Sequence, residues 1–196
     1  TLMGGFHLAI DSTAGERERG SLEPLLTTPV ARADLLLGKM AAAVSYMLLS
    51  LSLTVVGFTV ALYFVPLEQL GMRSNFGLLV ALKIVLILAP FVPLGAALMT
   101  LVASFTRSYK EAQTYLGLVL LVPTLPLMIA TLLNIRPDFS LMWIPSLSQH
   151  LLITELIKAE PLNLGHLGVS TTSTLLMGAL LAWLAIRLYD RERLLG

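Results

Sequence analysis

The sequence predicts an all-α fold, a polytopic bundle of transmembrane helices, from its composition and from the length of its apolar stretches. Of the 196 residues, 56% are hydrophobic and 13% are charged, whereas a soluble domain carries roughly 25% charged residues. Crossing a bilayer takes about 20 residues of helix. Four uncharged stretches reach that length: residues 40–67, 84–105, 112–135 and 167–186. Helices are favoured over a barrel, because no segment of about ten residues alternates in hydrophobicity.

Residues 1–10 are apolar but too few to span a bilayer. We interpret them as the inner end of a helix that begins before them, and we expect the sequence to be the C-terminal portion of a longer chain. Since no internal repeat or linker divides residues 1–196, we expect one membrane domain.

The segment before the first full span holds a dense charge cluster, Glu16 to Arg19, followed by a short apolar run. Ser21 can cap a helix there, and Glu23 and Pro24 are tolerated in its first turn. Such a helix carries Leu22, Leu25 and Leu26 on one face. This face suits docking into a groove on another protein. Alternatively, the charges are solvated and the leucines lie on the lipid surface.

Basic residues predict the orientation, because Lys and Arg concentrate on the cytoplasmic side of membrane proteins. Nine lie in the segments assigned to the cytoplasm: Arg17, Arg19, Arg32, Lys39, Arg107, Lys110, Arg187, Arg191 and Arg193. Three lie on the opposite side, Arg73, Arg136 and Lys158, and Lys83 lies just inside the second span. We therefore place residues 11–39, residues 106–111 and the C-terminus in the cytoplasm.

Four prolines predict kinks or breaks within two spans, because each removes a backbone donor: Pro90, Pro93, Pro123 and Pro126. Such breaks occur in translocation pathways and in inert bundles alike. In the last span, Ser170, Thr174, Gly178 and Ala182 recur every fourth residue. This stripe of small residues favours close packing of another helix.

Residues 134–166, on the predicted outer side, are mostly apolar but interrupted by Pro145, Gln149, His150 and Glu155. We expect an amphipathic or re-entrant helical pair in the outer leaflet, with Trp143 at the depth of the headgroups. The alternative is a gate over an exit pathway.

Several kinds of chemistry are not indicated. The chain has no cysteine, and its histidines, His7, His150 and His166, fall in separate segments. No Asp or Glu lies within the four spans, and Gly38-Lys39-Met40 is no phosphate-binding loop because it lacks the upstream glycine and the hydroxyl residue. We therefore expect no metal, no cofactor, no nucleic acid and no enzymatic activity of the chain itself.

The cytoplasmic segment resembles the first cytoplasmic loop of type-2 ABC exporter permeases, and most of all the sodium-efflux subgroup. The resemblance lies in Asp11-Ser12-Thr13-Ala14-Gly15-Glu16-Arg17-Glu18-Arg19-Gly20-Ser21-Leu22-Glu23-Pro24-Leu25-Leu26, followed by Pro29 and Leu35-Leu36-Leu37-Gly38-Lys39. It continues through the spans to Ile144-Pro145 and to Arg187-Leu188-Tyr189-Asp190-Arg191-Glu192.

The resemblance implies a permease with six transmembrane helices, of which the first, with an extracytoplasmic domain, is missing here. It implies an inner-membrane protein that pairs with a second permease unit and binds cytoplasmic ABC ATPase subunits, which bind the ATP. Glu16 to Leu26 would form the coupling helix, and Arg107 and Lys110 a lesser contact. The cargo would move outward, with sodium as the candidate.

Two further readings stay open from the residues. One is a secondary transporter or channel, which the lack of buried carboxylates disfavours, although carbonyl groups of broken helices can bind sodium without them. The other is a membrane scaffold that transports nothing.

Overall fold

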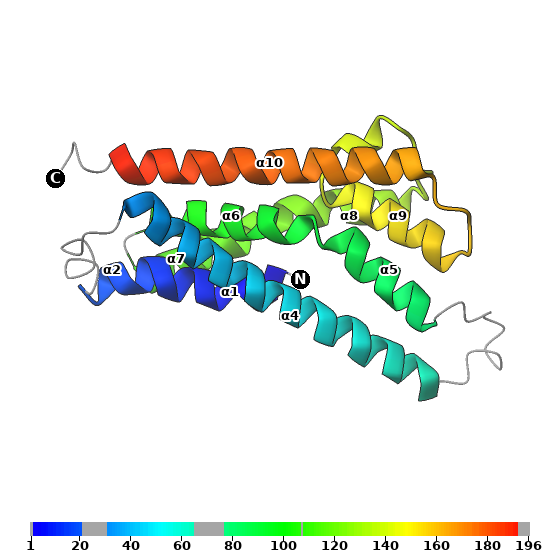
Figure 1. The fold of residues 1–196 in the computed structure, drawn as a ribbon, viewed down its shortest axis with the longest axis horizontal. Coiled ribbons are helices and arrows are strands. Elements are labelled where there is room, and N and C mark those ends of the chain that lie inside the picture. Colours follow the sequence, from blue (N-terminus) through cyan, green and yellow to red (C-terminus); the bar gives the residue numbers. More distant parts are fainter. Residues whose placement is uncertain (1, 21–30, 65–76, 107, 192–196) are drawn as a thin grey trace.

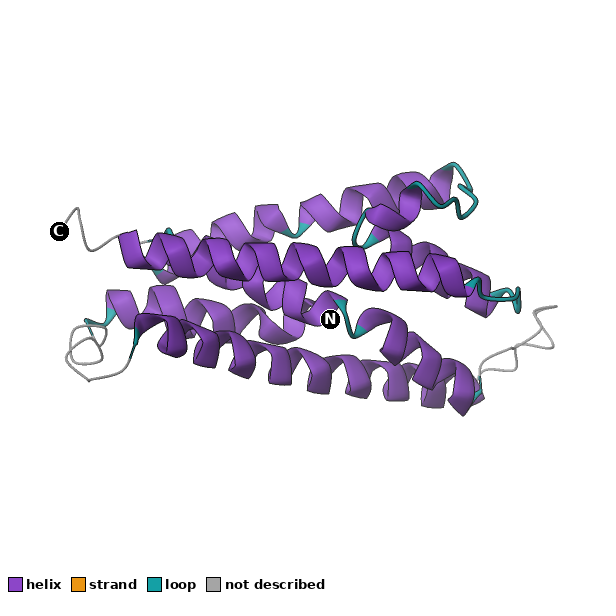
Figure 2. Ribbon diagram, turned by 45° about the horizontal axis from the view of Figure 1, so that its top comes forward, coloured by secondary structure: helices purple, strands orange, loops and turns teal. Residues whose placement is uncertain are grey.

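The structure, a computed structural model, describes residues 2–20, 31–64, 77–106 and 108–191. Within these ranges every regular element is a helix, which confirms the all-α prediction. Figure 1 shows the long helices running side by side along one axis, and Figure 2 shows that helices and loops alone make up the described part of the chain.

The first helix is longer than the sequence predicts. After α1 (Leu2–Ile10) the chain continues through a π-helical turn, Asp11–Gly15, into α2 (Glu16–Glu18). The backbone ends this helix at Gly20, whose φ of 70° is left-handed, a conformation that glycine adopts without strain just after a helix. Three of the four residues of the predicted charge cluster, Glu16 to Glu18, are therefore helical.

The next helix, α4 (Arg32–Phe64), begins at residue 32 rather than at the predicted residue 40. Its polar first turns extend the helix beyond the apolar part, because a helix does not end where hydrophobicity ends. It packs against α1 and α6 through buried Met47 and Leu51.

The predicted second span is two helices, α5 (Leu78–Leu88) and α6 (Phe91–Ser104), bent by 41° at Ala89 and Pro90. The third consists of α7 (Tyr109–Val119) and α8 (Leu121–Leu132), which join at Leu120. Pro126 lies inside α8. By length and composition, three described helices can cross a membrane, and a fourth can if the bent pair is one span.

The predicted outer segment contains a 3₁₀ turn, Leu141–Trp143, and α9 (Leu147–Ile157). Instead of resting on an outer surface, α9 packs into the bundle against α5, α8 and α10. Its buried leucines, Leu147, Leu151, Leu152 and Leu156, join one core with Ile84 and Ile87 of α5. Trp143 is exposed.

The last helix, α10 (Leu164–Arg191), makes its most extensive contact with α6. A Cβ built at Gly178 would lie 3.1 Å from the Cα atom of Leu94 and 3.2 Å from its backbone nitrogen. Ser170 and Thr174 of the same stripe are buried. The prediction that the stripe serves close helix packing is confirmed.

The described parts of the three segments predicted to be cytoplasmic lie at one end of the bundle. There Figure 1 shows α2, the beginning of α4, the beginning of α7 and the C-terminal end of α10. We call this the α2 end. The beginning of α5 and the end of α9 lie at the opposite end, which we call the α9 end.

Candidate functional site

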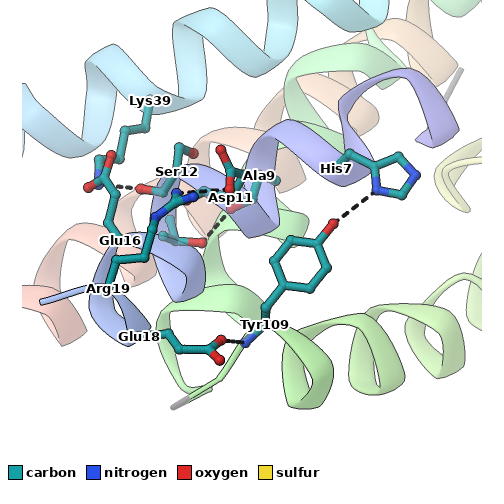
Figure 3. Close-up of polar contacts among 10 residues, drawn as sticks. His7, Ala9, Asp11, Ser12, Glu16, Glu18, Arg19, Lys39 and Tyr109 are labelled. Carbon is teal, nitrogen blue, oxygen red and sulfur yellow. Dashed lines mark hydrogen bonds and ion pairs between the residues drawn. The ribbon is translucent and has the colours of Figure 1, made fainter. Parts of the chain in front are cut away.

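A cluster of polar contacts at the α2 end joins α1, α2, α4 and α7 (Figure 3). We call this cluster the junction. It comprises His7, Asp11, Ser12, Glu16, Glu18, Arg19, Lys39 and Tyr109. Within it, three side chains of the predicted coupling segment meet partners that lie elsewhere in the chain.

Glu16 and Lys39 connect α2 to α4. The Nζ atom of Lys39 donates to a carboxylate oxygen of Glu16 and to the backbone carbonyl of Ser12. The side chain of Lys39 is 12% exposed and that of Glu16 is 22% exposed. Water screens so enclosed a pair much less than a surface pair, and removal of one partner leaves the other charge desolvated. This contact is therefore the strongest electrostatic tie in the junction.

Arg19, just after α2, pairs with Asp11, the first residue of the π-helical turn. The guanidinium Nη2 lies 2.9 Å from the Asp11 carboxylate, and both side chains are more than half exposed. An exposed pair of this kind contributes about 0 to 1 kcal/mol. Its effect is mainly local, because it holds Arg19 against the helix that precedes it.

Tyr109, the first residue of α7, contacts residues of α1 and of α2. Its backbone N–H donates to Glu18 Oε2 at 2.7 Å, so the carboxylate caps the positive end of α7. Its hydroxyl lies 3.3 Å from Nδ1 of His7 on α1. Ser108 completes the cap by accepting from the backbone N–H of Glu111 at 3.3 Å. The start of α7 is thus fastened to α1 and α2.

The structure places the predicted coupling residues unevenly. Glu16, Glu18 and Arg19 are in the junction, Arg17 lies between them in α2, and Gly20 forms the turn that follows. Lys110 is an exposed residue of α7 at the same end. The remaining predicted residues lie outside the described ranges: Ser21, Leu22, Glu23, Leu25, Leu26 and Arg107.

Sequence reasoning missed His7, Ser12 and Tyr109 as members of the junction and gave Lys39 no role beyond its charge. Tyr109 lies 91 positions from Glu18 and Lys39 lies 23 from Glu16. No local spacing reports contacts over such separations, and only the packing of α4 and α7 beside α1 brings the groups together.

The helix breaks predicted from the prolines border a cavity of about 390 Å³. Pro123 lines it directly, and Leu88 and Phe91 line it from either side of the break at Ala89 and Pro90. Pro93 and Pro126 lie in α6 and α8, the helices on either side of it. The sequence therefore located the helix interruptions but not the space between them.

Comparison with known proteins identifies related chains. The family model described as "ABC-2 family transporter protein" matches residues 3–190. The ABC transporter permease protein NatB of Bacillus subtilis (strain 168) is 34% identical over 164 residues, which cover 79% of this chain and 41% of that protein. The chain thus spans less than half of the relative's length. No solved structure matches the chain.

Proposed function

The chain belongs to the ABC-2 family of transporter proteins, and from this premise we propose that it is the transmembrane permease subunit of an ATP-binding-cassette exporter. The ATP would be bound and hydrolysed by a separate cytoplasmic ABC ATPase subunit. The chain would reside in the inner membrane with the α2 end in the cytoplasm, and two permease units would pair in the complete transporter.

The observation that carries this proposal is the junction. A coupling segment that is displaced by a partner transmits the displacement only if the residues next to it are fixed to helices that cross the membrane. Glu16 fixes α2 to α4 through Lys39, and Glu18 fixes it to α7 through Tyr109. Residues 21–26, which follow directly, would form the coupling helix and contact the ATPase.

Within that contact the leucines would supply most of the affinity. Burying a leucine side chain contributes roughly 1.5 to 3 kcal/mol, whereas an exposed ion pair contributes about 0 to 1 kcal/mol. Glu16, Glu18 and Arg19 have partners within the chain. Their role would therefore be to set the position of the loop, while Leu22, Leu25 and Leu26 fill an apolar cleft on the ATPase. Arg107 and Lys110 would add a lesser contact.

Displacement of the loop would reach the broken helices through the same ties. Tyr109 begins α7, which joins α8 at Leu120 beside the cavity. The α1 helix, which ends in the junction, contributes Leu2 and Met3 to the cavity wall. Closure of the ATPase subunits on ATP would thus change the walls of a space near the helix breaks, which would form part of the pathway.

Outward movement and sodium as the cargo rest on the resemblance to sodium-efflux permeases. A transport assay with the full-length permease and its ATPase, reconstituted into vesicles, tests both. Sodium flux that depends on ATP supplied at the α2 side would support the assignment. ATP turnover without sodium flux would leave the permease assignment standing and reject sodium.

The coupling segment itself is tested by Leu25→Asp and Leu26→Asp. A carboxylate cannot enter an apolar cleft without losing its hydration, so both variants should insert normally into the membrane but fail to copurify with the ATPase. Thr27→Asp, which adds the same charge beside the leucines, is the matched control and should retain the partner. Copurification of the ATPase with both leucine variants would refute the assignment.

A further inference from the structure

Three interruptions of the helical backbone border the same cavity. Leu88 and Phe91 line it at the α5–α6 break, Leu120 at the α7–α8 join, and Ser146 at the entry to α9. Irregular backbone at membrane depth is tolerated only where protein covers it or where it lines a cavity. In transporters, interrupted helices of this kind surround the substrate.

The entry to α9 is held in an unusual conformation. Ser146 has a φ of 72° although it is not glycine, and a residue in such a conformation persists only where its surroundings enforce it. Its backbone N–H donates to Gln149 Oε1 at 2.6 Å, and its hydroxyl donates to the carbonyl oxygen of Pro123 at 3.1 Å. The amide of Gln149 in turn donates to Thr174 Oγ1 at 2.7 Å. One network therefore fixes this wall of the cavity to α8 and α10.

The cavity wall combines a large apolar part with a few polar groups. Leucine, methionine, phenylalanine and isoleucine side chains make up most of it, and Thr124, Ser146, Gln149 and His150 contribute the hydroxyl, amide and imidazole groups. None of its lining residues is Asp, Glu, Lys or Arg. Burial lowers the pKa of the His150 imidazole, which favours its neutral form.

His150 lies between this cavity and a second space. It also lines a cleft of about 630 Å³, whose other residues include Arg136, Glu155, Lys158 and Glu160. His150 Nε2 lies 3.3 Å from Thr131 Oγ1 on α8. Of the residues that line the two spaces, His150 alone lines both. The smaller space is thus lined mostly by apolar side chains and by no charged one, and the larger space is polar and lies beside the end of α9.

We propose that the smaller cavity binds a neutral amphipathic small molecule and that His150 closes it on the side of the polar cleft. A volume of about 390 Å³ suits a small organic ligand, since ligand pockets measure about 300 to 1,000 Å³. The apolar walls accommodate its body, and Thr124, Gln149 and His150 meet its polar group. A bare cation would find no carboxylate there. This inference rests on the proposed permease function, and it names a neutral amphipathic molecule in place of sodium as the class of cargo that the permease would carry.

Photolabelling tests the ligand class in the full-length protein, in membranes without nucleotide. The probe is azioctanol, a neutral photoreactive alcohol, and labelled residues are mapped by mass spectrometry. Labelling should fall on the cavity residues of α8 and α9, and Leu127→Trp, which fills the cavity, should lower it about tenfold or more, the equivalent of about 1.4 kcal/mol. Leu125→Trp, on the exposed side of α8, is the matched control and should leave it unchanged.

Two results would overturn this ligand class. One is equal labelling in wild type and Leu127→Trp. The other is displacement of the probe by sodium chloride but not by choline chloride, which would assign the cavity to an ion. Thr124→Phe fills the same space from another position and distinguishes a filled cavity from a misfolded Leu127→Trp chain.

Cysteine accessibility tests the role of His150, since these residues contain no cysteine. Thr124 is exposed on α8, where lipid or the second permease unit would cover it. In full-length protein with any other cysteine replaced by serine, Thr124→Cys should therefore resist a charged, membrane-impermeant methanethiosulfonate reagent added at the α9 end. His150→Ala should raise its reaction rate about tenfold or more, because the reactive thiolate forms where water enters. Asn134→Cys in the cleft should react equally in both backgrounds.

Unchanged protection of Thr124→Cys in His150→Ala would overturn the closure. Neither labelling experiment requires ATP or the ATPase. Failure of the cavity proposal is therefore separate from failure of the proposed permease function, which copurification of the ATPase tests independently.

Discussion

At the scale of residues, Glu18 is the group whose role is least expected from its exposure. It is exposed, yet its carboxylate accepts the backbone N–H of Tyr109 at 2.7 Å and so joins α2 to α7. A carboxylate at a helix N-terminus contributes about 0.3 to 1 kcal/mol. Its contribution to stability is therefore small, and we propose that its main role is to transmit movement from α2 to α7.

We therefore predict that Glu18→Gln lowers ATP-driven transport severalfold while the free energy of unfolding falls by about 1 kcal/mol or less. Transport and thermal unfolding of the same preparation measure the two effects. Asp34→Asn is the matched control, because Asp34 is an exposed carboxylate in the first turn of α4. Equal transport losses in both variants would show that helix capping, rather than the tie to α7, matters.

Lys39 and Glu16 allow a quantitative test of the tie to α4. Their side chains are mostly buried, so we predict that a double-mutant cycle with Lys39→Met and Glu16→Gln gives a coupling energy of about 1.5 to 3 kcal/mol, as for hydrogen bonds to charged groups. Chemical unfolding of the four purified proteins measures it. Additive losses, with no coupling, would contradict the pairing.

Glu155 makes the α9 end sensitive to pH. Burial raises the pKa of its carboxyl above the ordinary value of 4.5, the charge of His166 lowers it and that of Glu160 raises it. Because the folded-state pKa is raised, the stability that this group contributes is fully present below pH 4.5 and is lost as pH rises through the folded-state pKa.

Glu155→Gln stays neutral, so we predict that the wild type loses more thermal stability than this variant as pH rises from 4.5 to about 7. Melting temperatures in detergent at a series of pH values measure the difference. Parallel curves for the two proteins would show that burial of Glu155 has no such effect.

At the scale of elements, the sequence predicted where helices exist and where prolines interrupt them, because composition and proline chemistry are local properties. It did not predict where they end. The helix that contains α1 runs on into α2, and α4 begins at Arg32, because charged residues continue a helix whenever their side chains find partners or water. The packing of α9 against α10 was not predicted either, because it depends on contacts between distant residues. In the structure Ser148 and Gln149 lie against α10, where Ser170 Oγ donates to Ser148 Oγ at 2.8 Å and Gln149 donates to Thr174.

The close packing of α10 on α6 depends on the glycine at position 178, which has no side chain. A Cβ at Gly178 would meet the backbone of Leu94 at 3.1 Å, so we predict that Gly178→Ala lowers the free energy of unfolding by about 1 to 3 kcal/mol through overpacking. Gly168 lies in the same helix with nothing within 4 Å of its Cβ position, and Gly168→Ala should be neutral or stabilising. Unfolding measurements that rank the two variants in the opposite order would contradict this packing.

At the scale of the whole molecule, the same helices connect the junction with the cavity. The junction at the α2 end holds α2, which precedes the proposed coupling segment, against α4 and α7. The helices α1 and α8 contribute to the walls of the cavity beside the helix breaks. The resemblance singled out Glu16, Glu18 and Arg19 of the junction, because that motif is contiguous, whereas their partners on α4 and α7 come from the structure alone. The cavity is lined by residues from four separate stretches of the chain, so no contiguous motif predicts it.

The most direct test is photocrosslinking from Leu25 in the full-length permease, expressed with its ATPase in cells. A photoreactive amino acid at this position should capture the ATPase subunit, with a yield that changes when ATP is replaced by ADP. The proposal that Leu25 contacts the ATPase in the cytoplasm would be contradicted by failure to capture an ATPase in either nucleotide state. It would also be contradicted by modification of Leu25→Cys by an impermeant reagent added outside intact cells.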